Sequence, residues 1–425
     1  MKDYLIYLTL SGLMIFATAG SAKCQDTDTL SVDPLDQYLV MAAENNANLK
    51  SLFIQYHAAL EKTTQVGILP DLSVMFSYFI NPVETRVGAQ KAGISVSQAF
   101  PWFGQLGAQE QAAAEKARAK YEMFQDARNK LYFEVKTAYY DLYVLKAATS
   151  ITEENIRFLG SYRELANVKL ESGKSSAVDL LRVEMDLAEL ENQLKLLMDS
   201  EEPIYSKFRE LLNLDTLDNI QIPDTLSRQW VEAGKTALMD SIMVNNPRLK
   251  QIDNEMSSLE NEIDVTHKMG LPSFSLGLSY TFISPRQDVE IPDNGKDAFI
   301  FPQVGVRLPL YRKKYNAMIR EKEYLRTAKV EERESREDKL NTELEKVWRD
   351  YLDASRRIDL YIHLAGLANQ SLDLLVTQYT TAGKDFEEIL RMDRQLLRYE
   401  LELEKARADQ NTNVAYINYL TGKQL

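Results

Sequence analysis

The stretch that decides the fold is LNTELEKVWRDYLDASRRIDLYIHLAGLANQSLDLLVTQY, residues 340–379. Its apolar side chains recur at alternating steps of four and three residues, which is the spacing of the a and d positions of a coiled coil. This period predicts a long helix that packs along other helices with a left-handed supercoil. The residues that carry the period are Leu340, Leu344, Val347, Tyr351, Ala354, Ile358, Tyr361, Ala365, Ala368, Leu372, Leu375 and Tyr379.

The same spacing occurs a second time, 209 residues earlier, over residues 131–170. Short segments repeat as well, since Asn45–Lys50 returns in modified form at Asn245–Lys250. Such self-similarity indicates two related halves. We expect a first repeat at 23–226 and a second at 227–425, each with a helix, a strand pair and a long helical hairpin. The strand pairs are predicted at 72–100 and 273–310, and the hairpins at 105–213 and 312–421.

The N-terminus has the pattern of a secretory signal. Lys2 precedes an apolar run, Tyr4–Ala17, and small residues follow as far as Ala22. This order predicts a signal peptide at 1–22 and export of the mature chain. Cys24 is the only cysteine, so no internal disulfide can form. Two interpretations of Cys24 stay open: a lipid attachment site, or an ordinary residue of the mature N-terminus.

The predicted strands are apolar on one face only. Over residues 274–282, phenylalanine, leucine and tyrosine alternate with serine, glycine and threonine. A strand of about ten residues can cross a membrane, and strands in lipid must close into a barrel. Four strands per chain are too few, because known barrels start at about eight strands. Several chains must therefore pool their strands, and a dimer, a trimer or a tetramer would each meet this condition. Such a barrel, continued by paired helices, would be a duct.

Composition excludes several classes of protein. The net charge of −13 argues against nucleic acid as a partner. His57, His267 and His363 lie far apart without the spacing of metal ligands. We find no nucleophile with a neighbouring base. We therefore predict no enzyme, no catalytic residue, no metal site and no cofactor.

The order of these elements resembles the TolC-type outer membrane efflux (outer membrane factor) family over the whole mature length. The resemblance is carried by the doubled layout, by the turn Gln98–Gly104, and by Gly173 followed six residues later by Asp179-Leu180-Leu181. It implies a homotrimer whose strands form a twelve-stranded barrel in outer-membrane lipid of a Gram-negative cell. It also implies a coiled-coil tunnel in the periplasm, a periplasmic adaptor (membrane fusion) protein and an inner-membrane pump of the resistance-nodulation-division type.

The resemblance further implies a gate of charged residues at the hairpin tips. By position we assign Asp179 to the first tip, and we expect left-handed turns at Gly173 and Gly383. Our hypothesis is that Lys384 pairs with Asp179 on a neighbouring hairpin while Glu388 lines the pore. The alternative is that these are solvated charges of little energetic weight. The charged residues assigned to the tips are Asp179, Lys384, Glu387, Glu388 and Arg391.

Aromatic residues near the strand ends predict contact with the membrane interface, where such side chains form a belt. The alternative is packing at the junction of strands and helices. The residues concerned are Tyr78, Trp102, Phe103, Tyr280 and Phe282.

The function that these expectations favour is the outer-membrane exit duct of a tripartite efflux system. The cargo, whether a metal, a drug or another small molecule, stays open, as do the identities of pump and adaptor. The alternatives are a type I secretion duct, a diffusion porin, or a structural coiled-coil protein of the envelope. A diffusion porin would leave the long helices without a role, and a structural coiled-coil protein would leave the alternating strands without one.

Overall fold

The computed structural model describes residues 34–216, 220–288, 290–382 and 386–423. The chain divides into Met1–Asp33 and Pro34–Leu425, and all described residues belong to the second part. The expected signal peptide, Cys24, Gly383 and Lys384 therefore lie outside the described residues.

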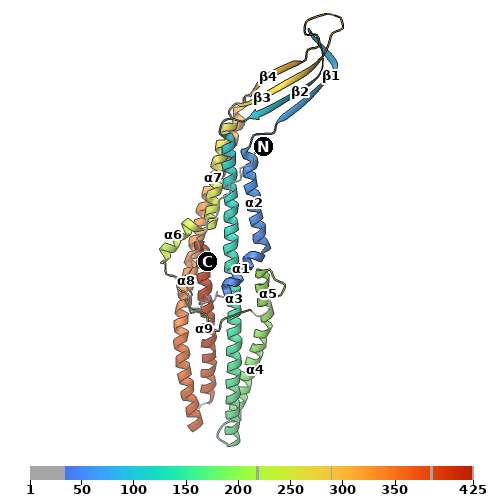
Figure 1. Cartoon of the computed structure of the whole chain (residues 1–425). Helices are drawn as coiled ribbons and strands as arrows, with labels where there is room; N and C mark the ends of the chain where they lie inside the picture. The colour runs from blue at the N-terminus through green and yellow to red at the C-terminus, as the bar shows by residue number, and fades with distance from the viewer. Residues whose placement is uncertain (1–33, 217–219, 289, 383–385, 424–425) are drawn as a thin grey trace, which may run out of the picture. The chain divides into compact units, whose positions relative to one another are not determined.

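Long helices make up most of the described chain (Figure 1). The two helical hairpins consist of α3 (Gln105–Glu171), α4 (Ala177–Asp199), α5 (Glu201–Leu212), α8 (Arg312–Ala382) and α9 (Phe386–Thr421). At 1.5 Å per residue, α3 and α8 are each roughly 100 Å long. Helix α3 packs against α4 and α9, and α8 packs along α9. Most of the a and d side chains of residues 340–379 are buried, as in Leu340, Ala354 and Tyr379, so the predicted coiled-coil packing is observed.

Shorter helices precede each strand pair. They are α1 (Pro34–Asn45), α2 (Ala47–Gly67), α6 (Lys235–Asn245) and α7 (Pro247–Met269). We expected one helix before each strand pair and find two, because the chain breaks at Asn46 and at Asn246. Each asparagine caps the following helix: the Asn46 side chain accepts the Leu49 N–H at 2.9 Å, and Asn246 accepts the Arg248 N–H at 3.0 Å. Asparagine is among the best N-cap residues, which explains the two breaks.

The return arm of the first hairpin is also divided. Helix α4 ends at Asp199 and α5 starts at Glu201, with Ser200 between them. Pro203 lies in the first turn of α5, where its missing N–H leaves no intrahelical bond unmade. The return arm of the second hairpin, α9, contains no proline and is a single helix.

The four strands form one antiparallel sheet in the order β1-β2-β3-β4. They are β1 (Ser73–Thr85), β2 (Gly88–Phe100), β3 (Ser273–Ser284) and β4 (Ala298–Arg307). Only Arg86 and Val87 separate β1 from β2. The register places apolar side chains opposite one another, as in the row Val74, Val96, Leu278. In the neighbouring rows the side chains of β2 and β3 are small and polar, as in Ser95 and Ser279, but Met75 of β1 and Ile300 of β4 lie in that same row. The predicted one-sided character is therefore clearest in the two central strands.

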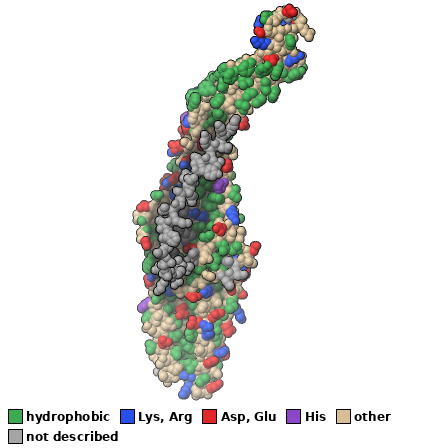
Figure 2. All heavy atoms as spheres, in the orientation of Figure 1, with side chains coloured by type: hydrophobic (Ala, Val, Ile, Leu, Met, Phe, Trp, Pro, Cys, Tyr) green, Lys and Arg blue, Asp and Glu red, His purple; other side chains and the backbone are tan. Residues whose placement is uncertain are grey.

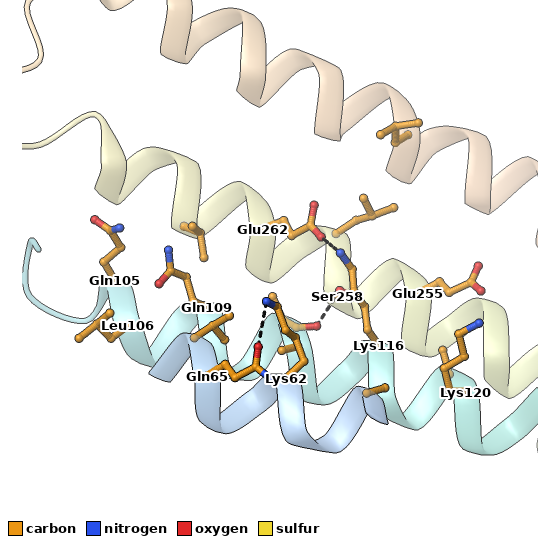
Figure 3. Close-up of a pocket in the computed structure, with 18 of the residues that line it drawn as sticks. Lys62, Gln65, Gln105, Leu106, Gln109, Lys116, Lys120, Glu255, Ser258 and Glu262 are labelled. Atoms are coloured by element: carbon orange, nitrogen blue, oxygen red, sulfur yellow. Dashed lines mark hydrogen bonds and ion pairs between the residues drawn. The ribbon is translucent and has the colours of Figure 1, made fainter. Parts of the chain in front are cut away.

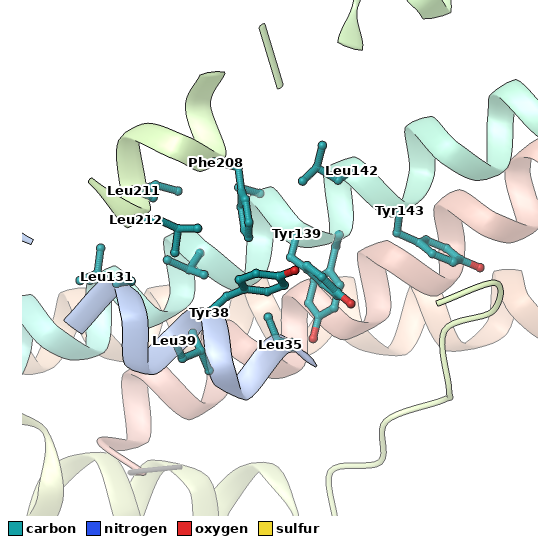
Figure 4. Close-up of a cluster of buried hydrophobic side chains, with 14 of the residues drawn as sticks. Leu35, Tyr38, Leu39, Leu131, Tyr139, Leu142, Tyr143, Phe208, Leu211 and Leu212 are labelled. Carbon is teal, nitrogen blue, oxygen red and sulfur yellow. The ribbon is translucent and has the colours of Figure 1, made fainter. Parts of the chain in front are cut away.

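The helices are held together by three clusters of buried apolar side chains. Figure 4 shows the first, in which Tyr38 of α1, Tyr139 of α3 and Phe208 of α5 point toward one another. The ring centroids of Tyr38 and Phe208 are 5.3 Å apart in an edge-to-face arrangement, which is favourable for aromatic pairs. The second cluster joins the two hairpins near their tips, and the third joins α6, α8 and α9.

Candidate functional site

The sheet presents an extended apolar surface. Figure 2 shows hydrophobic side chains gathered over the strands, with charged side chains at the far end of the sheet and along the helices. Phe76 and Tyr78 of β1 are each 78% exposed, and Val304 of β4 is 67% exposed. Within the described residues, no strand pairs with the outer edge of β1 or of β4. An exposed apolar face with two open edges suits lipid on one side and further strands at both edges.

The predicted belt residues fall into two groups. Trp102 and Phe103 lie in the turn between β2 and α3, where Trp102 stacks on Phe274 with centroids 6.2 Å apart. Tyr78 and Phe282 lie in one cross-strand row through Ala92, further along the sheet. Tyr280 contacts Phe282 at 5.0 Å. The five side chains are therefore spread along the sheet.

The loop between β3 and β4 is tied down by hydrogen bonds that the sequence pattern did not reveal. The Gly295 N–H donates to the carbonyl of Val87, in the β1–β2 turn, at 2.7 Å. The Asp297 carboxylate accepts the Tyr280 hydroxyl at 2.6 Å and the Ile283 N–H at 2.7 Å. These contacts join the two turns at this end of the sheet.

The first hairpin tip is built around Asp179. Gly173 ends α3 with a φ of 69°, and its N–H donates to the Leu170 carbonyl at 3.0 Å. Asp179 forms a capping box with Ser176 at the start of α4, and it also accepts the Ser175 hydroxyl at 2.8 Å. The Asp179 carboxylate is thus bound within its own turn. Its predicted partner, Lys384, lies outside the described residues.

The second tip contributes charges from the start of α9. Arg182 of α4 lies 3.9 Å from Asp179 and 2.9 Å from Glu387, so it connects the two tips. Glu388 and Arg391 form an ion pair within α9. We did not predict Arg182; its position three residues after Asp179, on the same helix face, was the available signal.

Tyr379 makes contacts beside these charges, both within the second hairpin and with the first. Tyr379, near the end of α8, is buried and lies 4.9 Å from Phe386 of α9, measured between ring centroids. Its hydroxyl is 3.3 Å from that of Ser175 in the first tip. The Lys169 ammonium lies 4.1 Å above the Tyr379 ring, a cation–π geometry, and donates to the Tyr379 carbonyl.

A groove of about 1200 Å³ lies between α2, α3, α7 and α8. Its walls carry alanines and other apolar residues together with lysine and glutamate side chains (Figure 3). Glu262 of α7 is paired with Lys116 of α3 and with Lys322 of α8, the latter at 2.6 Å. Burial opposes ionisation of Glu262, but the two ammonium groups outweigh it and hold the pKa below its ordinary value of 4.5. These ion pairs join three helices beside the sheet.

The described residues carry neither a metal-binding cluster nor a membrane-spanning helix. Within the described residues, no group of three or more His, Cys, Asp and Glu side chains is placed to hold a metal ion. His57 instead packs edge-on against Phe53, with centroids 4.6 Å apart. Of the helices in the described ranges, none is both long and apolar enough to cross a membrane.

Comparison with known proteins gives a family match over part of the chain and a shared fold. Residues 38–201 match the family described as Outer membrane efflux protein. An uncharacterized protein of Haemophilus influenzae is 22% identical over 308 residues, which are 64% of this chain and 67% of that protein.

Solved outer-membrane channels share the fold. The channel OprN matches with a TM-score of 0.75 and 16% identity, covering 92% of this chain and 90% of its own. CusC matches with a TM-score of 0.74 and 15% identity, covering 93% of each chain. The open state of the Neisseria gonorrhoeae MtrE channel matches with a TM-score of 0.72 and 14% identity, covering 92% of this chain and 89% of its own. The predicted combination of long helices with four antiparallel strands in one chain is confirmed.

Proposed function

We propose that this chain belongs to the outer membrane efflux protein family, whose sequence pattern it matches over residues 38–201. It is accordingly a transport conduit of the outer membrane with a periplasmic helical portion, and not an enzyme. Our proposal is that it is the exit duct of a tripartite system, fed by a periplasmic adaptor and an inner-membrane pump of the resistance-nodulation-division type. Small molecules or metal ions would leave the cell through it.

The observation that carries this proposal is the sheet. Four antiparallel strands, apolar on one face and open at both edges, cannot be stable alone in lipid. Three chains would supply twelve strands, enough to close a barrel around a lumen lined by the small polar rows. The long helices would continue that lumen into the periplasm. The internal repeat supports this arrangement, since each half would supply one strand pair and one hairpin.

The hairpin tips are the proposed gate. Asp179, Glu387, Glu388 and Arg391 bring charge to the periplasmic end, and we extend this group by Arg182. Gly173 completes the first proposed tip, and Gly383 and Lys384, which lie outside the described residues, are assigned to the second by their place in the sequence. The aromatic residues of the sheet would lie at the membrane interface.

The first test is the mass of the purified chain in detergent. A species of three chain masses that resists mild heating supports the duct, whereas a soluble elongated dimer contradicts it and favours a structural coiled-coil protein.

The second test is growth of a deletion strain, with and without complementation, on copper, zinc, cobalt, detergents and antibiotics. Sensitivity to metals or to amphiphiles would name the cargo class, and a loss of protein secretion alone would favour a type I secretion duct.

A further inference from the structure

A small polar cluster lies within the apolar interface between the hairpins. It consists of Asn155 of α3, Asp186 of α4 and Asp393 of α9, which are 6%, 9% and 1% exposed. The Asn155 side-chain N–H donates to Asp393 Oδ2 at 3.2 Å, although 238 residues separate the two positions. Asp186 Oδ1 lies 3.5 Å from Arg394. Buried carboxylates in a coiled-coil interface are costly unless they are paired, so their presence needs a reason.

The surroundings of the cluster are largely apolar. The second apolar cluster, which joins the hairpins, contains residues within four positions of the polar cluster on three helices: Leu159 of α3, Leu187 of α4 and Leu390 of α9. Two charged groups act directly on Asp393: Asp186 of α4, which has the same charge, and Arg394 of α9, which has the opposite charge. Asp393 in turn acts on Tyr162 of α3 and Glu400 of α9. The next charges outward are acidic, with Glu189 acting on Asp186, Asp373 on Tyr162, and Glu154 on Glu400. An ionised Asp393 would therefore add a negative charge to an interface that already carries several.

The hydrogen bonds of the cluster fit the neutral form of Asp393. Asn155 Oδ1 is buried and has no hydrogen-bond partner, as is also true of Asp186 Oδ2. A protonated Asp393 carries an O–H that can donate to an amide oxygen, while its other oxygen accepts the Asn155 N–H. Protonation would satisfy the unpartnered acceptor of Asn155 and remove the buried charge in one step. Burial, reinforced by Asp186, raises the pKa of Asp393 to about 6, although Asn155 and Arg394 act in the opposite direction.

We propose that Asn155 and Asp393 form a proton-sensitive latch that fastens α9 to the α3–α4 hairpin. When Asp393 is neutral, the acid and the amide pair and the two hairpins pack tightly. When Asp393 is charged, the amide oxygen loses its donor and the acidic groups repel one another, so α9 loosens near the tip. The latch is a property of the helices themselves, and it rests on the proposed function only where passage through the tip is concerned.

The direction of the pH effect follows from linkage. A carboxyl whose pKa is raised in the folded form stabilises the packed arrangement at low pH, and this stabilisation is lost as the pH rises through about 6. If the loosened state restores an ordinary carboxyl near pH 4, the opening equilibrium of α9 increases roughly tenfold between pH 5 and pH 8.

The test is hydrogen exchange of the full chain in detergent at pH 5 and pH 8, with rates corrected for the intrinsic effect of pH. We expect residues 386–400 to open about tenfold more readily at pH 8, and residues 406–420 of the same helix to serve as an internal reference. Asp393→Asn, which is neutral at both pH values, should abolish the difference. Glu184→Gln, which removes an exposed carboxyl of α4, should retain it.

Two results would overturn the latch: a wild-type chain with equal opening at both pH values, or an Asp393→Asn chain that keeps the tenfold change. The wild-type comparison decides the matter even if the variant does not fold. Conductance in planar bilayers separates this inference from the proposed function. A chain that forms no channel would count against the exit duct, whereas the exchange experiment would still decide the latch.

Discussion

Arg182 of α4 and Glu387 of α9 form an ion pair with 2.9 Å between Nη1 and Oε2, and this contact joins the tips of two hairpins that lie about two hundred residues apart in sequence. The Arg182 side chain is partly exposed and that of Glu387 is largely exposed, so the pair contributes only up to about 1 kcal/mol to stability. Its position at the tip suits a contact that can be made and broken.

Reversing the charge at this pair should favour an open tip. We expect Arg182→Glu to raise conductance in planar bilayers several-fold, because two carboxylates then repel each other across the tips. The double variant Arg182→Glu with Glu387→Arg should return conductance toward wild type. Arg163→Glu, an exposed change on α3, is the matched control. Equal conductance in all of these variants would remove the pair from the gate.

The two faces of the sheet should respond differently to one charge. Leu278 lies in the apolar row with Val74 and Val96, and Ser279 lies beside Ser95 in the neighbouring row, whose two central residues are serines. We expect Leu278→Arg to reduce the heat-resistant assembled protein strongly, because a charge facing lipid costs about 2–4 kcal/mol near the bilayer midplane. Ser279→Arg should assemble and instead reduce passage. Gel mobility before and after heating measures assembly, and equal assembly of both variants would contradict the assignment of the faces.

The β1–β2 turn depends on Gly88. Its φ is 136°, and an added Cβ would lie 1.8 Å from the carbonyl oxygen of Ser284. We expect Gly88→Ala to lower the yield of folded protein in detergent and its melting temperature, because the neighbouring backbone must move. Gly107 lies within α3 with nothing within 4 Å of an added Cβ. Gly107→Ala should therefore stabilise the chain by about 0.5–1 kcal/mol. If both variants instead lose the same amount of stability, the φ of Gly88 and the crowding around it do not explain the effect.

Glu262 should contribute to stability in a pH-dependent way. Its pKa is lowered in the folded chain, so the contribution is present above pH 4.5 and is lost as the pH falls through the lowered value. We expect Glu262→Gln to destabilise the chain by about 1 kcal/mol at pH 7 and by much less below pH 4. Thermal melting followed by circular dichroism measures the difference. The control is Glu260→Gln, which removes an exposed carboxyl two residues earlier on α7. This variant should have no such effect. A loss that is the same at both pH values would show that Glu262 acts through packing alone.

The helices and strands could be predicted because their signals are local. The a and d period of Leu340–Tyr379 and the alternation of Phe274–Phe282 each record which face of one element is covered. The helix breaks at Asn46 and Asn246 also have a local signal, because asparagine is a favoured N-cap residue. We did not predict them because the helical pattern continues on both sides of each asparagine.

The contacts between distant elements were decided by tertiary structure. Arg182 meets Glu387, and Asn155 meets Asp393, only because of the register in which two hairpins lie side by side. A shift of one helical turn would preserve every apolar period and lose both contacts. By itself, the sequence determined the long helices, the one-sided strands and therefore the need for further chains. Which charges meet at the tips, and which carboxyl is buried between them, followed from packing, because a periodic pattern fixes the face of a helix and leaves its axial register open.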